Sequence, residues 1–591
     1  MQSAETVLGV LRERGRRGLP LDELYRQLFN PQLYLLAYGR IYSNQGAMTP
    51  GACGETVDGM SLGKIGRIID ALRHERFRFS PVRRAYIPKK NSSKQRPLGL
   101  PSWTDKLVGE VVRLLLEAYY EPQFSNRSHG FRPRRGCHTA LSEVATTWTG
   151  TAWFIESDIA DCFGSLDHQV MLSILTEKIH DGRFLQLVHG MLKAGYLEDW
   201  TWNATLSGVP QGGTASPIMS NIYLHRLDDF VERVLIPQYT RGSYRARNRT
   251  YGTLTAAIGR ARRRGDRDRV TLLRKGQRAM PSVDPDDPGY RRLRYIRYAD
   301  DHLLGFAGPK AEAEEIKQRL AQFLHDDLKL ELSADKTLIT HARTGAARFL
   351  GYEISVGHND TKLTGGRRAV NGGIKLAVPT RVLDAKRAQY LQGNGKPLRR
   401  TALMNMHPYT IIGTYGAEYR GFVQYYLLAG NVARLNRLRW DMQRSMCTTL
   451  AAKHRTTPWA MADRYKSTIK TPHGKRRCFE AKPERTGRTP LVARFGGIPL
   501  RRKKDAVLID RAPNPNRPGK QLLQRLLTGV CELCAATDGI TVHHIRRLAD
   551  LHTAQSADPP DWVTLMSAKR RKTLVACDRC HSTIHHRHDN T

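Results

Sequence analysis

The sequence contains two adjacent carboxylates, Asp300 and Asp301, with apolar residues on both sides. The runs at 293–298 and 303–306 predict two short β-strands, with the aspartates where the hairpin turns. Neighbouring carboxylates repel each other, and a pair of Mg²⁺ ions would relieve that repulsion and could hold both oxygens of a phosphoryl transfer. A solvated turn without chemistry explains these residues equally well, so a third carboxylate upstream must decide.

Asp158 provides that third carboxylate, at the end of an apolar segment at residues 152–157. We expect the segment to be a β-strand. Polymerase active sites combine one carboxylate on one strand with a pair on a neighbouring hairpin, so that all of them converge on two metal ions. Asp158, Asp300 and Asp301 are therefore the predicted catalytic residues and the predicted ligands of two Mg²⁺ ions.

Three stretches of the chain closely resemble reverse transcriptases encoded within group II introns. They are the run Tyr298-Ala299-Asp300-Asp301, the Asp158 segment with Phe163 five residues on, and the run Pro210-Gln211-Gly212 between them. The resemblance implies an α+β multidomain protein with the fingers and palm of a right-hand polymerase. It also implies an RNA-directed DNA polymerase that copies intron RNA by target-primed reverse transcription.

Five residues are expected to bind the incoming dNTP. A predicted hairpin carries Lys89 and Arg96 on its two arms, and two such cations suit a triphosphate. Basic surface hairpins without this role are common in a cationic chain, and the family resemblance decides for the triphosphate. The resemblance further implies that Phe163 is a steric gate against a 2′-hydroxyl. It also implies that Gln211 hydrogen-bonds the nucleotide or template base and that Lys336 assists the leaving pyrophosphate.

The charge of the chain indicates a polyanionic partner. Lysine and arginine number 95 against 55 aspartates and glutamates, which gives a net charge of +40 over 591 residues. Nucleic acid is favoured over a membrane, because the sequence has no run of about 18 apolar residues. The first 20 residues have no apolar signal core, which predicts a cytoplasmic protein, in the bacterial cytoplasm or nucleoid.

Four cysteines near the end of the chain form two Cys-x-x-Cys pairs: Cys531 with Cys534, and Cys577 with Cys580. In a reducing compartment, four thiolates at this spacing are typical of a tetrahedral structural Zn²⁺ site. The sequence therefore predicts a structural zinc ion here rather than two disulfides.

Histidines lie between and after these cysteines. His581 and His585 are four residues apart, so a helix would place them on one face, and with His543 they could bind a divalent ion such as Mg²⁺. His544, which would point away from the metal, would be the general base that activates water against a phosphodiester. This arrangement resembles HNH endonucleases of the colicin type, although the middle asparagine of that motif is not evident. A second structural zinc site and an inert DNA-binding remnant are the alternatives.

The remaining segments surround these two sites. The helical pattern at 370–465 resembles the thumb, or maturase domain X, and the basic insertion at 237–290 is expected to be largely helical and to contact RNA. Residues 466–525 are expected to be an extended basic linker that binds DNA. The predicted domains are an N-terminal extension with a template-contacting loop (1–65), fingers and palm (66–369), the thumb (370–465), the basic DNA-binding region (466–525), and a small zinc-containing ββα HNH domain (526–591).

Together these features predict a multifunctional group II intron-encoded protein. It would bind intron RNA as a maturase and assist splicing, copy that RNA from dNTPs, and nick the target DNA with the HNH domain. The alternatives are a reverse transcriptase of a defence or diversity-generating system, an RNA-binding splicing cofactor without polymerase activity, and a zinc-containing DNase with a polymerase remnant.

Overall fold

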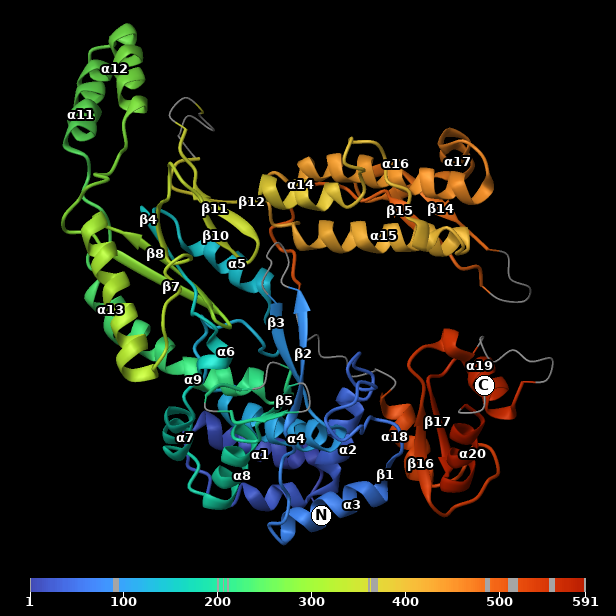
Figure 1. The fold of residues 1–591 in the computed structure, drawn as a ribbon. Helices are drawn as coiled ribbons and strands as arrows, with labels where there is room; N and C mark the ends of the chain where they lie inside the picture. The colour runs from blue at the N-terminus through green and yellow to red at the C-terminus, as the bar shows by residue number, and fades with distance from the viewer. Residues whose placement is uncertain are drawn as a thin grey trace.

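The computed structural model is a mixed α/β protein of several domains (Figure 1). It describes residues 2–88, 95–198, 201–205, 207–209, 212–359, 362, 370–483, 489–508, 519–551 and 559–588. Two of the predicted dNTP-binding residues, Lys89 and Gln211, lie outside these ranges. Within the described ranges, the helices are too short or too polar to cross a membrane.

The N-terminal third is built around a long buried helix, α4 (Trp103–Tyr120). Ser102 caps it by accepting a hydrogen bond from the Asp105 amide, and most of its residues are buried on all sides. The helices α1 and α2 pack against it. The other helices of this region are α1 (Ala4–Arg16), α2 (Pro31–Ile41), α3 (Leu62–Arg73), α5 (Cys137–Thr147), α6 (Cys162–Ser165), α7 (His168–Thr176) and α8 (Gly182–Leu192).

The predicted basic hairpin is present as β2 (Val82–Pro88) and β3 (Gln95–Leu100), paired antiparallel. It belongs to a four-stranded sheet of order β3-β2-β5-β6, completed by β5 (Tyr196–Glu198) and β6 (Thr201–Asn203).

A second four-stranded sheet has the order β7-β8-β4-β9 and carries the predicted catalytic strands. Its alternate residues enter two different cores: Ile155 and Leu304 pack with α9 and α13, whereas Phe154 and Leu303 face Trp148 and α5. This alternation explains why its strands read as nearly continuous apolar runs. The elements are β4 (Trp153–Ser157), α9 (Ser216–Phe230), β7 (Arg292–Tyr298), β8 (Asp301–Ala307), α13 (Lys310–Leu328) and β9 (Leu338–His341).

The basic insertion forms a hairpin of two helices, α11 (Arg249–Arg263) and α12 (Arg267–Ala279), which projects from the rest of the molecule (Figure 1). The prediction that this segment is largely helical is confirmed. Only Ile258 and Ala261 of α11 are buried, and no residue of α12 is. The hairpin therefore exposes nearly all of its arginines to solvent.

The helical region after residue 370 contains two long helices, α15 (Pro408–Tyr425) and α16 (Leu435–His454), with α14 (Thr380–Ala388) and α17 (Pro458–Tyr465) beside them. A small sheet precedes it: β10 (Ala347–Phe349), β11 (Tyr352–Val356) and β12 (Ile374–Ala377).

The expectation of an extended linker after residue 465 was wrong for its first half. A three-stranded antiparallel sheet packs there against α15, with Phe479 and Phe495 in the same core as the helices. The apolar residues of one sheet face supply the burial that a linker would lack. The strands are β13 (Lys466–Thr471), β14 (Gly474–Ala481) and β15 (Ala493–Gly496).

The C-terminal domain has the predicted ββα arrangement of β16 (Ile540–His544), β17 (Thr573–Cys577) and α20 (Asp578–His588). Its other helices are α18 (Gly519–Thr528) and α19 (Asp561–Lys569). A short strand from the N-terminal region, β1 (Met60–Ser61), pairs with the outer edge of β16. Val542 and Val575 are fully buried in the core of the N-terminal helices, so the two ends of the chain share one hydrophobic core.

Candidate functional sites

The three predicted catalytic carboxylates come together at the end of the β7-β8-β4-β9 sheet. In the antiparallel register of β4 and β8, Ser157 lies opposite His302, so the next position, Asp158, comes opposite Asp301. Asp300 forms the turn between β7 and β8. The Lys336 ammonium donates a hydrogen bond to the Asp158 carboxylate at 2.5 Å.

The electrostatics of this site indicate a need for cations. Desolvation by the surrounding protein, together with the charges of Asp300 and Asp158, raises the pKa of Asp301 to about 7. Burial and the nearby Asp158 also raise the pKa of Asp300. Hard carboxylate oxygens that repel one another fit Mg²⁺ as ligands. Within the described ranges, these three do not form as tight a cluster as the C-terminal sites below.

A buried ion pair that the sequence analysis missed supports the catalytic turn. Ala299 has a left-handed backbone, with φ of 55°, and its carbonyl accepts a hydrogen bond from Arg297 at 2.8 Å. Arg297 is fully buried and forms a two-pronged ion pair with the equally buried Asp228, at 2.8 and 2.6 Å. A Cβ on Gly130 would come within 2.3 Å of the Ala299 amide nitrogen, so the turn also requires a glycine beside it.

The described dNTP-binding candidates lie around these carboxylates. Arg96, on β3, is near enough to Asp300 to lower the pKa of that carboxyl, which counters part of the effect of burial. Phe163 lies in α6, partly buried, with its ring centroid 6.2 Å from that of Phe131. The backbone carbonyl of Phe163 accepts a hydrogen bond from the Val209 amide, which joins the backbone of α6 to the glycine-rich segment.

The four predicted zinc ligands also come together. One ligand atom from each of Cys531, Cys534, Cys577 and Cys580 lies within 4.8 Å of the others. The Cys534 and Cys577 sulfurs are 3.6 Å apart. The first pair follows α18, and the second lies where β17 meets α20. Four thiolates at this separation fit a tetrahedral zinc ion.

His543, His581 and His585 form a second cluster, and the structure adds a fourth member, Asp58. Asp58 Oδ2 lies 2.8 Å from His585 Nε2, and Oδ1 lies 3.3 Å from both His581 Nε2 and His543 Nδ1. Three imidazoles and a carboxylate fit a divalent transition-metal ion. No sequence pattern pointed to Asp58, because it precedes the histidines of the HNH motif by most of the chain.

His544, the predicted general base, is not on the same side of β16 as these ligands. Successive side chains of a strand point to opposite faces, so His544 faces α2, where its Nε2 is 2.9 Å from the Tyr38 hydroxyl. It is 5% exposed, and burial lowers its pKa to about 3. The structure therefore brings the three histidines predicted to bind a metal ion together and holds the His544 side chain away from them, as predicted.

Family models match three separate parts of the chain. Residues 87–251 match a reverse transcriptase (RNA-dependent DNA polymerase) model, residues 374–495 a type II intron maturase model, and residues 531–581 an AI2M/AI1M-like HNH endonuclease model. The chain is also 37% identical to group II intron-encoded protein LtrA of Lactococcus lactis subsp. cremoris, over 96% of each chain.

The chain belongs to the group II intron-encoded proteins. It is 31% identical to the putative COX1/OXI3 intron 1 protein of Saccharomyces cerevisiae, over 94% of this chain and 68% of the relative. Protein YkfC of Escherichia coli is 32% identical over 57% of this chain. This group II intron-encoded protein is thus an RNA-directed DNA polymerase, a maturase and an HNH-type endonuclease, as the sequence analysis predicted. The rival functions are not favoured.

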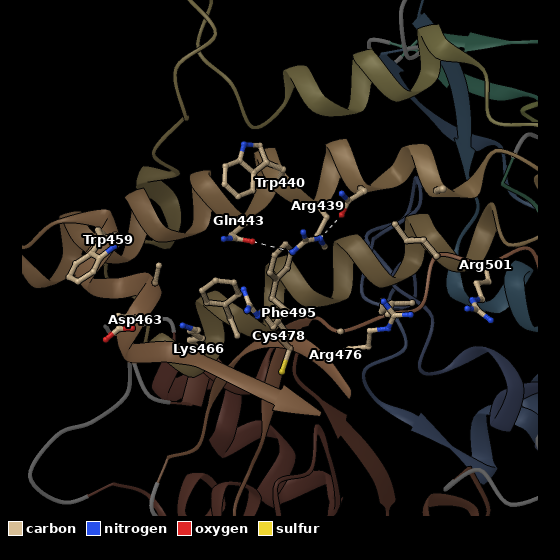
Figure 2. Close-up of a pocket in the computed structure, with 18 residues that line it drawn as sticks. Arg439, Trp440, Gln443, Trp459, Asp463, Lys466, Arg476, Cys478, Phe495 and Arg501 are labelled. Carbon is tan, nitrogen blue, oxygen red and sulfur yellow. Dashed lines mark hydrogen bonds between the residues drawn. The ribbon is translucent and has the colours of Figure 1, made fainter. Parts of the chain in front are cut away.

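The maturase part of this group II intron-encoded protein contains an open groove of about 710 Å³ between α16, α17 and the β13–β15 sheet. Figure 2 shows Trp440 and Trp459 on the helices and Arg476 and Arg501 on the opposite side. Trp440 is 53% and Trp459 78% exposed, which is unusual for such large apolar rings. The other cationic residues that line the groove are Arg439, Lys466 and Arg477.

Proposed function

We propose that Asp158, Asp300 and Asp301 bind two Mg²⁺ ions and form the polymerase active site. The register of β4 and β8, which aligns Asp158 with Asp301, is the observation that carries this proposal. Bound Mg²⁺ would stabilise the negative charge of the transferred phosphate. The sheet with β2 and β3 would be the fingers, the sheet with β4 and β8 the palm, and α14–α17 the thumb.

Cations around the carboxylates have complementary roles in this proposal. Arg96 grips the triphosphate from β3, and Lys89 has the same role. Lys336 now donates to Asp158, and with a nucleotide bound it turns to the leaving pyrophosphate. Gln211 orients the nucleotide or the template base, and Phe163 excludes a 2′-hydroxyl.

Primer extension on an RNA template tests the catalytic assignment. Asp300→Ala removes one carboxylate, so DNA synthesis falls below detection while RNA binding is retained. The matched control is Asp335→Asn, because Asp335 is an exposed acid next to Lys336 in the sequence. Normal synthesis by Asp300→Ala would overturn the proposal, and loss of RNA binding would show a folding defect instead.

We further propose that intron RNA binds along the basic helical hairpin α11–α12 and in the groove of Figure 2. Arginines of the hairpin would contact phosphates, and the exposed rings of Trp440 and Trp459 would stack on unpaired bases. Trp459→Ala should then weaken intron RNA binding by about 1–3 kcal/mol. Binding that is unaffected by Trp459→Ala and by Trp440→Ala would exclude the groove.

In the C-terminal domain we propose a structural Zn²⁺ on the four cysteines and a catalytic divalent ion on His543, His581 and His585. His544 remains the proposed general base. Its side chain must break its contact with the Tyr38 hydroxyl before it can reach the substrate. Nicking of the target DNA by His585→Ala and His544→Ala tests the two roles separately. His585→Ala should lose both metal and activity, and His544→Ala should lose activity alone. A His544→Ala variant that nicks like wild type would remove its role.

A further inference from the structure

The histidine cluster of the HNH domain receives a side chain from the other end of the chain. Asp58 precedes β1, and its two carboxylate oxygens face three imidazoles at 2.8–3.3 Å. The ligand atoms of the four residues all lie within 4.8 Å of one another. Asp58 is thus as much a part of the cluster as the histidines are.

The position of Asp58 is fixed by backbone contacts. The Gly59 amide donates to the Val542 carbonyl at 3.0 Å, and the His544 amide donates to Asp58 Oδ1 at 2.7 Å. Met60, which follows, pairs with Val542 in the ladder of β1 and β16, and both are fully buried. The carboxylate therefore does not reach the cluster by a chance rotamer of an exposed side chain.

His543 supplies independent evidence for a ligand. His543 is 3% exposed, and in the described ranges neither of its ring nitrogens makes a hydrogen bond, although Nδ1 lies 3.3 Å from Asp58 Oδ1. A buried imidazole nitrogen without a hydrogen bond is costly, and a metal ion at the centre of the cluster would satisfy the nitrogen that faces it.

The number of ligands matters for the chemistry. Catalytic metal sites hold their ion with three protein ligands and keep one position open, whereas closed sites fill all four. Three histidines would leave one position for a phosphate oxygen of DNA, and the Asp58 carboxylate, an anionic oxygen donor beside the same three imidazoles, would fill that position. Substrate and Asp58 would then compete for one place on the ion.

We propose that Asp58 is the fourth ligand of the HNH metal ion and that it closes the nuclease until DNA displaces it, an inference that rests on the proposed HNH activity. His585 is half exposed, so DNA can approach the ion from that side. Replacement of Asp58 by DNA on the ion requires movement of the loop at Asp58. The hydrophobic core shared by the two ends of the chain can stay intact. The tether through β1 keeps the carboxylate at a high effective concentration.

Nickel binding and DNA nicking test the two halves of the proposal. The full-length protein is treated briefly with a chelator, so that zinc remains on the cysteines alone, and Ni²⁺ is then titrated by calorimetry. Asp58→Asn keeps the size of the side chain but weakens the ligand, and we expect Ni²⁺ affinity to fall at least about tenfold. Nicking at saturating metal should become several-fold faster. The matched control Asp70→Asn changes an exposed acid of the same region, ion-paired with Arg76, and should alter neither.

His585→Ala separates the inference from the proposed nuclease function. Like Asp58→Asn, this variant should bind Ni²⁺ more weakly than the wild type. Unlike Asp58→Asn, which should nick DNA faster, it should lose nicking activity. Unchanged Ni²⁺ affinity in Asp58→Asn would overturn the proposal that Asp58 is a metal ligand. Slower or unchanged nicking by this variant would overturn the proposal that Asp58 closes the nuclease. If no variant and no wild-type protein nicks DNA, the nuclease and the closure both fail, and a fall in Ni²⁺ affinity still supports Asp58 as a ligand.

Discussion

Removal of Asp228 should destabilise the polymerase sheet strongly. Asp228 and Arg297 are both fully buried, and the carboxylate accepts two hydrogen bonds from the guanidinium and one from Tyr295. Asp228→Ala leaves a buried positive charge without its partner, which costs about 3–5 kcal/mol. With a urea slope of about 3 kcal/mol per M, the midpoint of unfolding should fall by at least about 1 M.

The assay is urea unfolding followed by circular dichroism and, in parallel, by the loss of primer extension. Asp70→Ala is the matched control, because it breaks an exposed ion pair with Arg76 and should cost less than about 1 kcal/mol. The double variant Asp228→Leu with Arg297→Met removes both charges and should regain most of the lost stability. It still lacks the donor to the Ala299 carbonyl, so its primer extension should stay slow. A cost of Asp228→Ala no larger than that of the control would refute the reasoning.

Three further predictions concern other sites. Phe163→Ala should let the polymerase incorporate ribonucleotides while dNTP incorporation continues, measured with each nucleotide on one RNA template; unchanged discrimination would remove the gate. Cys580→Ser should unfold the C-terminal domain and release one zinc per chain by metal analysis, while primer extension persists; retention of zinc would contradict the four-cysteine site. Burial raises the pKa of Asp105 to about 6 from about 4 in the unfolded chain, so the folded state binds the proton more tightly. The stabilisation of the folded state by this tighter proton binding is fully present below about pH 4 and is lost as the pH rises through about 6. Asp105→Asn should therefore gain up to about 3 kcal/mol relative to wild type between pH 4 and pH 7, measured by urea unfolding at both; a constant difference would refute it.

The sequence was sufficient where the chemistry lies in short motifs. The strands around Asp158 and Asp300, the two cysteine pairs and the histidines on α20 all lie where their local patterns predicted, because alternation and helical spacing are local properties. A local pattern also marks the start of α2, because Asn30 caps this helix and Pro31 is its first residue.

Long-range contacts could not be predicted. Arg297 reads as an ordinary basic residue of a strand, and only the packing of α9 against the sheet shows that Asp228 neutralises it. Asp58 reads as part of a turn-rich loop, and β1 has two residues, too few for a strand signal. The sheet of β13–β15 was missed because its strands are polar on one face and their burial depends on α15.

The core shared by the two ends of the chain limits how such proteins can gain or lose an endonuclease. Deletion of residues 526–591 would uncover Met60, which pairs with Val542, and the side of α2 where Tyr38 and Tyr42 contact His544. A lineage that discards the nuclease must therefore acquire polar replacements at those N-terminal positions. A comparison of natural sequences with and without the endonuclease domain should show paired changes at the two distant ends of the gene.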